Sequence, residues 1–258
     1  MDFNDILKAE PGAKPFLIAG PCSAESERQV LTTASELSGA GVAVFRAGLW
    51  KPRTRPGNFE GVGEKGIEWM QRVRETTGMA LATEVATPSH VEACLAAGID
   101  ILWIGTRTSG NPFAMAELAS ALADADKEQI VLVKNPLCPN VEAWIGAIER
   151  IKASGLRNVG AILRGFADFS GSECRNPPHW EVAHSLKREM PDLPVMIDPS
   201  HMAGKRELIE GLLGRAIAEG FGSFMIESHC RPEQALTDSR QQLTPADLYR
   251  MMHSIFEI

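Results

Sequence analysis

Residues 195–238 decide the fold, because they contain VMIDPSH at 195–201 and SFMIESHC at 223–230 before ending in ALTD. Each segment begins with a short apolar run and stops on groups able to bind a cation, which are Asp198, His201, Glu227 and His229. An apolar run bounded by turn residues is typical of a buried parallel strand, and chemistry in α/β folds usually lies just past the carboxyl end of such a strand. The stretch therefore predicts two strands that carry half of a metal site.

Short apolar segments of the same kind recur along the whole chain, with helical patterns between them. They lie at 16–19, 42–46, 80–83, 101–104, 130–134, 161–163, 195–197 and 224–226. Eight alternating strand and helix units predict a single (β/α)8 TIM barrel. We expect the barrel to occupy residues 15–258, with residues 1–14 as a short N-terminal extension that covers its bottom.

Helix boundaries are marked by capping residues. Thr87-Pro88 predicts an N-cap and first turn, Gly98 predicts the end of the same helix, and Thr244-Pro245 predicts the start of the last helix. Another helix is expected to begin near Ser23. Its N-terminal dipole would favour a thiolate at Cys22.

Composition excludes several classes of protein. The chain has 258 residues, 44% of them hydrophobic, with a net charge of −7 and a pI near 5.5, which argues against a nucleic-acid binder. Neither a signal peptide nor an apolar run long enough to span a membrane is present in the sequence. The five cysteines are scattered without CxxC spacing, so we expect a soluble protein of the reducing cytoplasm.

Cationic residues end or follow four of the eight predicted strands. They are Arg46, Lys51, Arg53, Arg107, Lys134 and Arg164, while the third strand ends on Glu84. In a barrel these side chains converge on one face, and in an acidic protein they form a focused anion site. Substrates that carry phosphate and carboxylate groups fit this pattern.

Four residues offer donors for a divalent transition ion such as Mn, Fe, Co or Zn: Cys22, His201, Glu227 and Asp238. Each also has an ordinary structural interpretation. Cys22 fits a small core residue, His201 fits a contact to loop backbone, and Asp238 fits an Asx-turn.

Two further alternatives concern the partners of these groups. Glu227 fits an ion-pair partner of Lys134 or Arg164 inside the barrel. Cys230 lies close enough to Glu227 in sequence to be a rival metal ligand. His229 fits a residue that contacts the metal ligands rather than the metal itself.

Four motifs in order, GPCS (20–23), KPRT (51–54), DPSH (198–201) and IESH (226–229), resemble those of one enzyme family. The chain resembles the catalytic domain of 3-deoxy-D-arabino-heptulosonate-7-phosphate (DAHP) synthase, of the short type I subclass close to KDO-8-phosphate synthase. The resemblance runs from Phe16 to Thr244. The sequence of residues 45–56 and 133–136 is similar to that of DAHP synthases fused to a C-terminal chorismate mutase. The mutase domain itself is absent from this sequence.

The resemblance implies roles for individual residues. Metal ligands fall on Cys22, His201, Glu227 and Asp238, and these four with Lys51 form the implied catalytic set. Phosphoenolpyruvate would be bound by Arg46, Lys51, Arg107, Lys134 and Arg164. Erythrose 4-phosphate would be bound by the 51–54 loop, including Arg53 and Thr54, with Glu84 and Asp198 also lining the substrate site. One departure is the Asn-Pro-Leu-Cys that follows Lys134, where many relatives have Arg-Gly.

The implied activity is a metal-dependent, aldol-like condensation of phosphoenolpyruvate with erythrose 4-phosphate that releases phosphate, the first step of the shikimate pathway, in a cytoplasmic homo-oligomer (dimer or tetramer). Three alternatives stay open: a KDO-8-phosphate synthase, a Schiff-base aldolase using Lys134 or Lys51, and a non-catalytic barrel partner of chorismate mutase. Because no regulatory domain precedes Phe16 in the sequence, we expect weak feedback by tyrosine or phenylalanine.

Overall fold

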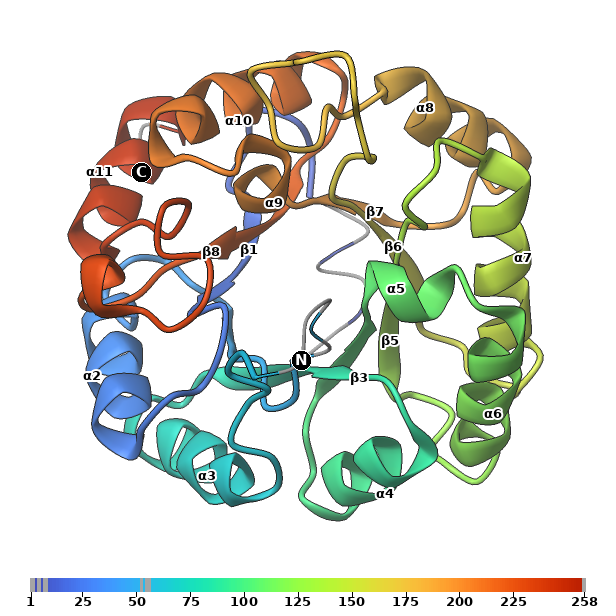
Figure 1. The fold of residues 1–258 in the computed structure, drawn as a ribbon, viewed down its shortest axis with the longest axis horizontal. Coiled ribbons are helices and arrows are strands. Elements are labelled where there is room, and N and C mark those ends of the chain that lie inside the picture. Colours follow the sequence, from blue (N-terminus) through green and yellow to red (C-terminus); the bar gives the residue numbers. More distant parts are fainter. Residues whose placement is uncertain (1–2, 4–5, 7–8, 52, 54–56, 257–258) are drawn as a thin grey trace.

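Eight parallel strands close into a barrel in chain order, and β1 pairs with β8 to complete it (Figure 1). The structure is a computed structural model that describes residues 3, 6, 9–51, 53 and 57–256. The strands are β1 (Phe16–Gly20), β2 (Val44–Arg46), β3 (Ala80–Val85), β4 (Ile101–Ile104), β5 (Ile130–Lys134), β6 (Val159–Leu163), β7 (Val195–Ile197) and β8 (Ser223–Glu227). The predicted (β/α)8 barrel is therefore confirmed.

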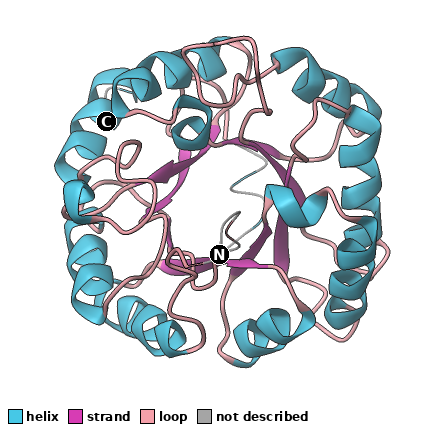
Figure 2. Cartoon of the chain, in the orientation of Figure 1, coloured by secondary structure: helices cyan, strands magenta, loops and turns pink. Residues whose placement is uncertain are grey.

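Helices form a ring around the barrel, outside the strands (Figure 2). They are α2 (Glu27–Leu37), α3 (Lys65–Thr77), α4 (Pro88–Ala96), α5 (Thr106–Ser109), α6 (Pro112–Leu122), α7 (Val141–Lys152), α8 (Trp180–Glu189), α9 (Pro199–Ala203), α10 (Ile209–Ala218) and α11 (Pro245–Phe256), with 3-10 turns η1 (Arg206–Leu208) and η2 (Pro232–Gln234). Thr87 caps α4 through its side chain, as predicted. Within the described residues, none of these helices has the length and apolar content to cross a membrane.

Some predicted boundaries are wrong. β2 begins at Val44 rather than at residue 42, and β6 begins at Val159 rather than at residue 161. The largest error concerns α2, which starts at Glu27 because the Ser26 side chain accepts from Gln29 N and caps it. Cys22 lies ahead of that cap, so the expected stabilisation of a thiolate by the helix dipole is wrong.

Alternation along the strands explains where the polar groups lie. Successive strand residues point to opposite faces, and a buried apolar cluster inside the barrel contains every second strand residue, among them Phe16, Ile18, Val44, Ala82, Ile101, Trp103, Ile130, Leu132, Ile162, Met196 and Met225. The other strand residues pack against the helices in the main core. Continuing the inward series by two residues reaches Arg46, Glu84, Lys134, Arg164, Asp198 and Glu227, at the carboxyl end of the barrel.

The opposite end of the barrel is apolar. Ile6 is buried in the same interior cluster, and its carbonyl accepts a hydrogen bond of 3.1 Å from Ser223 Oγ at the start of β8. The charged residues that continue the inward-facing strand series therefore lie at the face where the strands end.

Candidate active site

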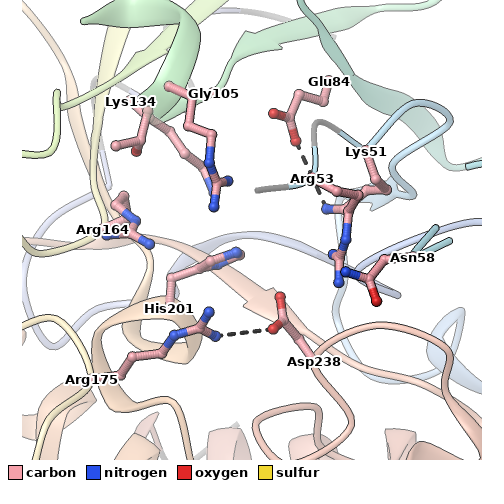
Figure 3. A pocket seen from close by; sticks show the side chains of 12 residues that line it. Lys51, Arg53, Asn58, Glu84, Gly105, Lys134, Arg164, Arg175, His201 and Asp238 are labelled. Atoms are coloured by element: carbon pink, nitrogen blue, oxygen red, sulfur yellow. Dashed lines mark hydrogen bonds and ion pairs between the residues drawn. The ribbon is translucent and has the colours of Figure 1, made fainter. Parts of the chain in front are cut away.

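A cavity of about 310 Å³ opens at the carboxyl ends of the strands. Figure 3 shows side chains from several strands and loops facing the same space, with the cations of β5 and β6 opposite the segment after β2. The lining residues are Lys51, Arg53, Asn58, Glu84, Gly105, Thr106, Arg107, Lys134, Arg164, Arg175, His201 and Asp238. A cavity with this many cations is suited to an anionic substrate.

Arg46 lies beneath this cavity and is 1% exposed. Its guanidinium carbon sits 4.7 Å from the centre of the Trp103 ring, and Nη2 donates to Glu227 Oε1 at 3.3 Å. Nε and Nη1 have no hydrogen-bond partner among the described residues. Because a buried guanidinium normally satisfies its donors, these two nitrogens are suited to an anion bound in the barrel mouth. The predicted pairing of Glu227 with Lys134 or Arg164 is wrong, since Arg46 takes that place.

Lys134 pairs with Asp198 instead. Its Nζ lies 2.7 Å from Asp198 Oδ2, and both side chains are buried. Burial opposes the charge on Asp198, but His201 and Lys134 outweigh it and lower the pKa of this carboxyl well below its usual range. Asn135, part of the sequence departure noted after Lys134, donates to Gly165 O at 2.8 Å and accepts from Arg164 N at 2.8 Å. It thereby joins the ends of β5 and β6.

Lys51 lies between the first and third strands. Its Nζ donates to Cys22 O at 3.2 Å and lies 3.9 Å from Glu84 Oε2. Burial opposes its charge, yet Cys22, Glu84 and Glu227 raise the pKa of Lys51 above its usual value. Gly105 leaves the space that Glu84 occupies, because a Cβ at residue 105 would lie 2.1 Å from Glu84 Oε1.

The remaining cations complete the wall of the cavity. Burial, with Arg175 and Arg107 nearby, lowers the pKa of Arg164 to about 10, so it stays charged at neutral pH. Arg53 is half-buried, whereas Arg107 is exposed. The predicted site residue Thr54 lies outside the described residues, as does Pro52.

Three of the four predicted metal ligands are adjacent. Ligand atoms of Cys22, Glu227 and Asp238 lie within 4.8 Å of one another, and Cys22 Sγ donates to Asp238 Oδ2 at 3.4 Å. Burial, together with Glu227 and Asp238, raises the pKa of the Cys22 thiol far above its usual value. A bound cation would reverse this effect, because it stabilises a thiolate and both carboxylates at once. These residues therefore fit a divalent metal ion.

His201 lies beside this cluster. Its Nε2 is 3.6 Å from Glu227 Oε1, and its Nδ1 is 2.8 Å from Asp198 Oδ2, a close charge contact rather than an aligned hydrogen bond. Asp198 Oδ1 also accepts from His201 N at 3.0 Å and caps α9. Asp198 thus orients the imidazole, an arrangement common around metal-binding histidines.

Cys230 and His229 face elsewhere. Cys230 N donates to Thr33 Oγ1 on α2, and its sulfur lies 3.9 Å from Gln29 O. His229 Nδ1 accepts from Arg231 N at 2.8 Å and Nε2 lies 3.7 Å from Glu25 Oε2. Both belong to a separate cavity beside α2, so the prediction of Cys230 as a rival ligand is wrong.

Sequence reasoning missed several residues of the site. Arg175 pairs with Asp238 Oδ1 at 3.0 Å, Gln241 donates to Glu227 Oε2 at 2.7 Å, and Gln242 accepts from Cys22 N at 2.9 Å. Asn58 lines the cavity. All four lie in loops, away from any strand end. Gln241 and Gln242 are buried in the structure, but two adjacent glutamines beside a turn give no local sequence signal of that burial.

Asp238 adopts a left-handed backbone with φ of 47°. Its two carboxylate oxygens contact Arg175 and Cys22. These contacts place the side chain in the cavity, whereas the Asx-turn alternative would direct it to its own backbone.

Comparisons with known proteins agree with this geometry. The chain is 35% identical over 227 residues to phospho-2-dehydro-3-deoxyheptonate aldolase of Thermotoga maritima, a match that covers 88% of this chain and 64% of the relative. It is 25% identical to a 2-dehydro-3-deoxyphosphooctonate aldolase of Polaromonas naphthalenivorans, over 94% of this chain and 90% of that relative. A crystal structure of the Thermotoga maritima DAHP synthase superimposes with a TM-score of 0.83 at 31% identity, covering 94% of this chain and 68% of that one.

The chain therefore spans about 64% of the length of the Thermotoga aldolase that it matches. The family model described as "DAHP synthetase I family" matches residues 5–257, nearly the whole sequence. The fold, the strand-end cations and the thiol–carboxylate cluster all lie within the matched range. The chain belongs to the DAHP synthetase I family.

Proposed function

We propose that this barrel condenses phosphoenolpyruvate with erythrose 4-phosphate to give DAHP and inorganic phosphate. The observation that carries the proposal is one cavity lined both by cations and by His201 and Asp238, with Cys22 and Glu227 offering ligand atoms within 4.8 Å of Asp238. One part of such a site suits two anionic substrates and the other suits an electrophilic metal. The family membership and the Thermotoga relative's name support the same reaction.

The cations bind and align the substrates. Arg46, Lys134 and Arg164 surround the space where the carboxylate and phosphate of phosphoenolpyruvate would bind, and Arg53 is placed to bind the phosphate of the aldose. Holding two anions together against their repulsion is a large part of the catalytic task.

In the reaction, the methylene carbon of phosphoenolpyruvate forms a bond to the aldehyde carbon, and the aldehyde oxygen takes a proton. Water adds to the carbon left electron-poor, and the bond from that carbon to the phosphate oxygen breaks. A divalent ion held by Cys22, Glu227, Asp238 and His201 would act as a Lewis acid toward the aldehyde. Lys51 and Glu84, 3.9 Å apart at the cavity wall, form the acid–base pair placed to carry protons.

A Schiff-base mechanism is disfavoured by the two lysines. Raising the pKa of Lys51 keeps its amine protonated, and Lys134 is held in a buried pair with Asp198. A Schiff-base lysine needs a neutral amine.

KDO-8-phosphate synthase is the second candidate, because relatives named for that product match 83% or more of their own length at 25–27% identity. The test is phosphate release from phosphoenolpyruvate with erythrose 4-phosphate and with arabinose 5-phosphate, in parallel. We expect preference for the four-carbon aldose. Preference for the five-carbon aldose would replace the assignment, and no release with either would favour the non-catalytic alternative.

Metal dependence has its own test. We expect a chelator to abolish turnover and Mn, Co or Zn to restore it. Cys22→Ala should lose bound metal, measured by elemental analysis. Cys94→Ala should keep it, because Cys94 is a buried residue of the outer helix α4. Full metal content in Cys22→Ala would contradict the assignment of the ligands.

The finer subclass is also a proposal. The relatives named as octonate aldolases support a type I barrel close to KDO-8-phosphate synthase. The motifs at 45–56 and 133–136 support the form that is fused to chorismate mutase. A cytoplasmic homo-oligomer is the assembly we propose, and light scattering of the purified protein would test it.

A further inference from the structure

We propose that Gln241 is a positioning residue of the metal cluster. Its side-chain amide holds Glu227 directly and Asp238 through Arg175, so that each carboxylate turns one oxygen outward and one toward the cluster. The inference rests on the proposed function, because it concerns the ion that the cluster would hold.

The contact to Glu227 is direct. Gln241 is 1% exposed, Glu227 is fully buried, and Gln241 Nε2 donates to Glu227 Oε2 at 2.7 Å. The other carboxylate oxygen, Oε1, lies on the side of His201, 3.6 Å from its Nε2. Oε1 also accepts from Arg46 Nη2 at 3.3 Å. With Oε2 bound to the amide, the carboxylate cannot rotate without breaking a buried hydrogen bond, which is unfavourable because the donor or acceptor is left without a partner.

The contact to Asp238 passes through an arginine. Arg175 Nη1 donates to Asp238 Oδ1 at 3.0 Å (Figure 3). The same nitrogen donates to Gln241 Oε1 at 3.3 Å. The second oxygen of Asp238, Oδ2, is the one that accepts from Cys22 Sγ. Gln241 N also donates to Asp238 O at 3.1 Å, which fixes the turn that brings this aspartate into the cavity.

The next residue acts on the third member of the cluster. Gln242 Oε1 accepts from Cys22 N at 2.9 Å, while its Nε2 donates to Thr237 O at 2.8 Å. Residues 241 and 242 therefore contact the segments of Cys22, Glu227 and Asp238 together. Gln241 is the one of the pair whose amide touches a carboxylate of the cluster.

Physical chemistry explains why such a residue is needed. Two carboxylates held close together repel each other, and unrestrained side chains would turn apart. Outer contacts that orient metal ligands typically contribute 10- to 100-fold in metal affinity. A purely structural role, in which Gln241 only satisfies buried polar groups, would lower stability and leave metal affinity unchanged.

The experiment uses Cd²⁺, a divalent ion that prefers thiolate, as the probe. Affinity is measured by competition with a chromophoric chelator, and ligation by Cys22 is followed through the ultraviolet thiolate-to-cadmium charge-transfer band. Gln241→Met keeps the length of the side chain and removes the amide. The matched control is Gln129→Met. Gln129 directly precedes β5 at the opposite end of the barrel, and the substitution removes the hydrogen bond from its side-chain amide to Asp100 O.

We expect Gln241→Met to weaken Cd²⁺ binding about 10- to 100-fold, with the charge-transfer band intact at saturation, and Gln129→Met to bind like the unmodified protein. Unchanged affinity in Gln241→Met overturns the inference alone. Absence of the band in the unmodified protein overturns it together with the metal part of the proposed function.

A second variant covers the case in which Gln241→Met does not fold. The Arg175 side chain is 53% exposed, so Arg175→Met should fold, and it cuts the connection between Gln241 and Asp238. We expect a smaller loss of Cd²⁺ affinity, about 3- to 10-fold at the lower end of such effects. An affinity equal to that of the unmodified protein would contradict the inference.

Discussion

Six cations in and beneath the cavity fall into two sets that differ in how the fold holds them. Lys51 belongs to neither set, because it lies in a connection but its side chain is only 9% exposed beside Glu84. The strand cations, Arg46, Lys134 and Arg164, lie in or directly after β2, β5 and β6, whereas the loop cations, Arg53, Arg107 and Arg175, lie in the connections. Arg46 is 1% and Lys134 4% exposed, while the Arg175 side chain is 53% exposed. Arg46 and Lys134 are fixed by the barrel and by the buried carboxylates of Glu227 and Asp198, whereas Arg164 is half-buried and contacts the backbone of Gly165.

This difference suggests a division of labour. A buried and fixed cation can bind an anion without ordering its own side chain, so it contributes most to a substrate that reacts deep in the barrel. An exposed loop cation loses side-chain conformational entropy each time it binds the anion, which lowers its net contribution to affinity. We infer that the strand cations bind phosphoenolpyruvate, together with Lys51 and Arg107 as the family resemblance implies, and that Arg53 is the loop cation that binds the aldose phosphate.

The largest effect is expected from Lys134→Met. It leaves Asp198 buried without its lysine, which costs about 3–5 kcal/mol of stability when a buried pair loses one partner. The kcat/KM for phosphoenolpyruvate should fall about 100-fold, since charged hydrogen bonds contribute roughly 1.5–3 kcal/mol. Denaturant unfolding and steady-state kinetics measure the two losses, with exposed Lys152→Met on α7 as control. Equal behaviour of both variants would remove the distinction between strand and loop cations.

Gly105→Ala should have a smaller effect on stability and a clear effect on rate. The new Cβ would lie 2.1 Å from Glu84 Oε1, so the carboxylate must move away from Lys51. We expect a loss of about 1–3 kcal/mol and roughly 10- to 100-fold in kcat. Gly110→Ala is the matched control, because its Cβ would meet its nearest neighbours at the ordinary distance of 3.6 Å. A Gly105→Ala enzyme with unchanged kcat would show that Glu84 takes no part in the reaction.

The contrast between strands and loops also marks what the sequence could predict. Short continuous apolar runs bounded by turn residues located every strand within a few residues, and the polar residue that ends or follows the run marked Arg46, Lys134, Asp198 and Glu227. These follow from local pattern alone, because a parallel strand fixes both the direction and the neighbours of its last side chain.

Loop contacts do not follow from local pattern. Arg175 reaches Asp238 across 63 residues of sequence, and Gln242 reaches Cys22 across 220. Both pairings depend on how two loops pack together. The expected helix start near Ser23 failed for a related reason, since the Ser26 cap decides where α2 begins. The contact of His201 with Asp198 was not predicted, and neither was the pairing of the same carboxylate with Lys134.

Arg53→Ala tests the loop set directly. Removing this half-buried guanidinium should raise the KM for erythrose 4-phosphate about 10- to 100-fold, the equivalent of roughly 1.5–3 kcal/mol for charged hydrogen bonds, and change the KM for phosphoenolpyruvate little. Folding should be unaffected, and Arg157→Ala, exposed in a surface pair with Glu128, is the control. A comparable rise in both KM values would contradict the assignment of Arg53 to the aldose.

The smallest effect is a difference in salt dependence between the two substrates. Added salt screens exposed charges strongly and buried ones much less, because the Debye length falls from about 10 Å at 0.1 M to about 3 Å at 1 M. If loop cations bind the aldose phosphate, its KM should rise a few-fold more than that of phosphoenolpyruvate between about 0.05 and 0.5 M sodium chloride. Steady-state kinetics at saturating concentration of the other substrate give the two slopes, and a matched series in Arg53→Ala should flatten the aldose slope toward that of phosphoenolpyruvate. Equal slopes in the unmodified protein would mean that both anions meet similarly screened cations, in which case burial in the strands does not separate the two binding sites.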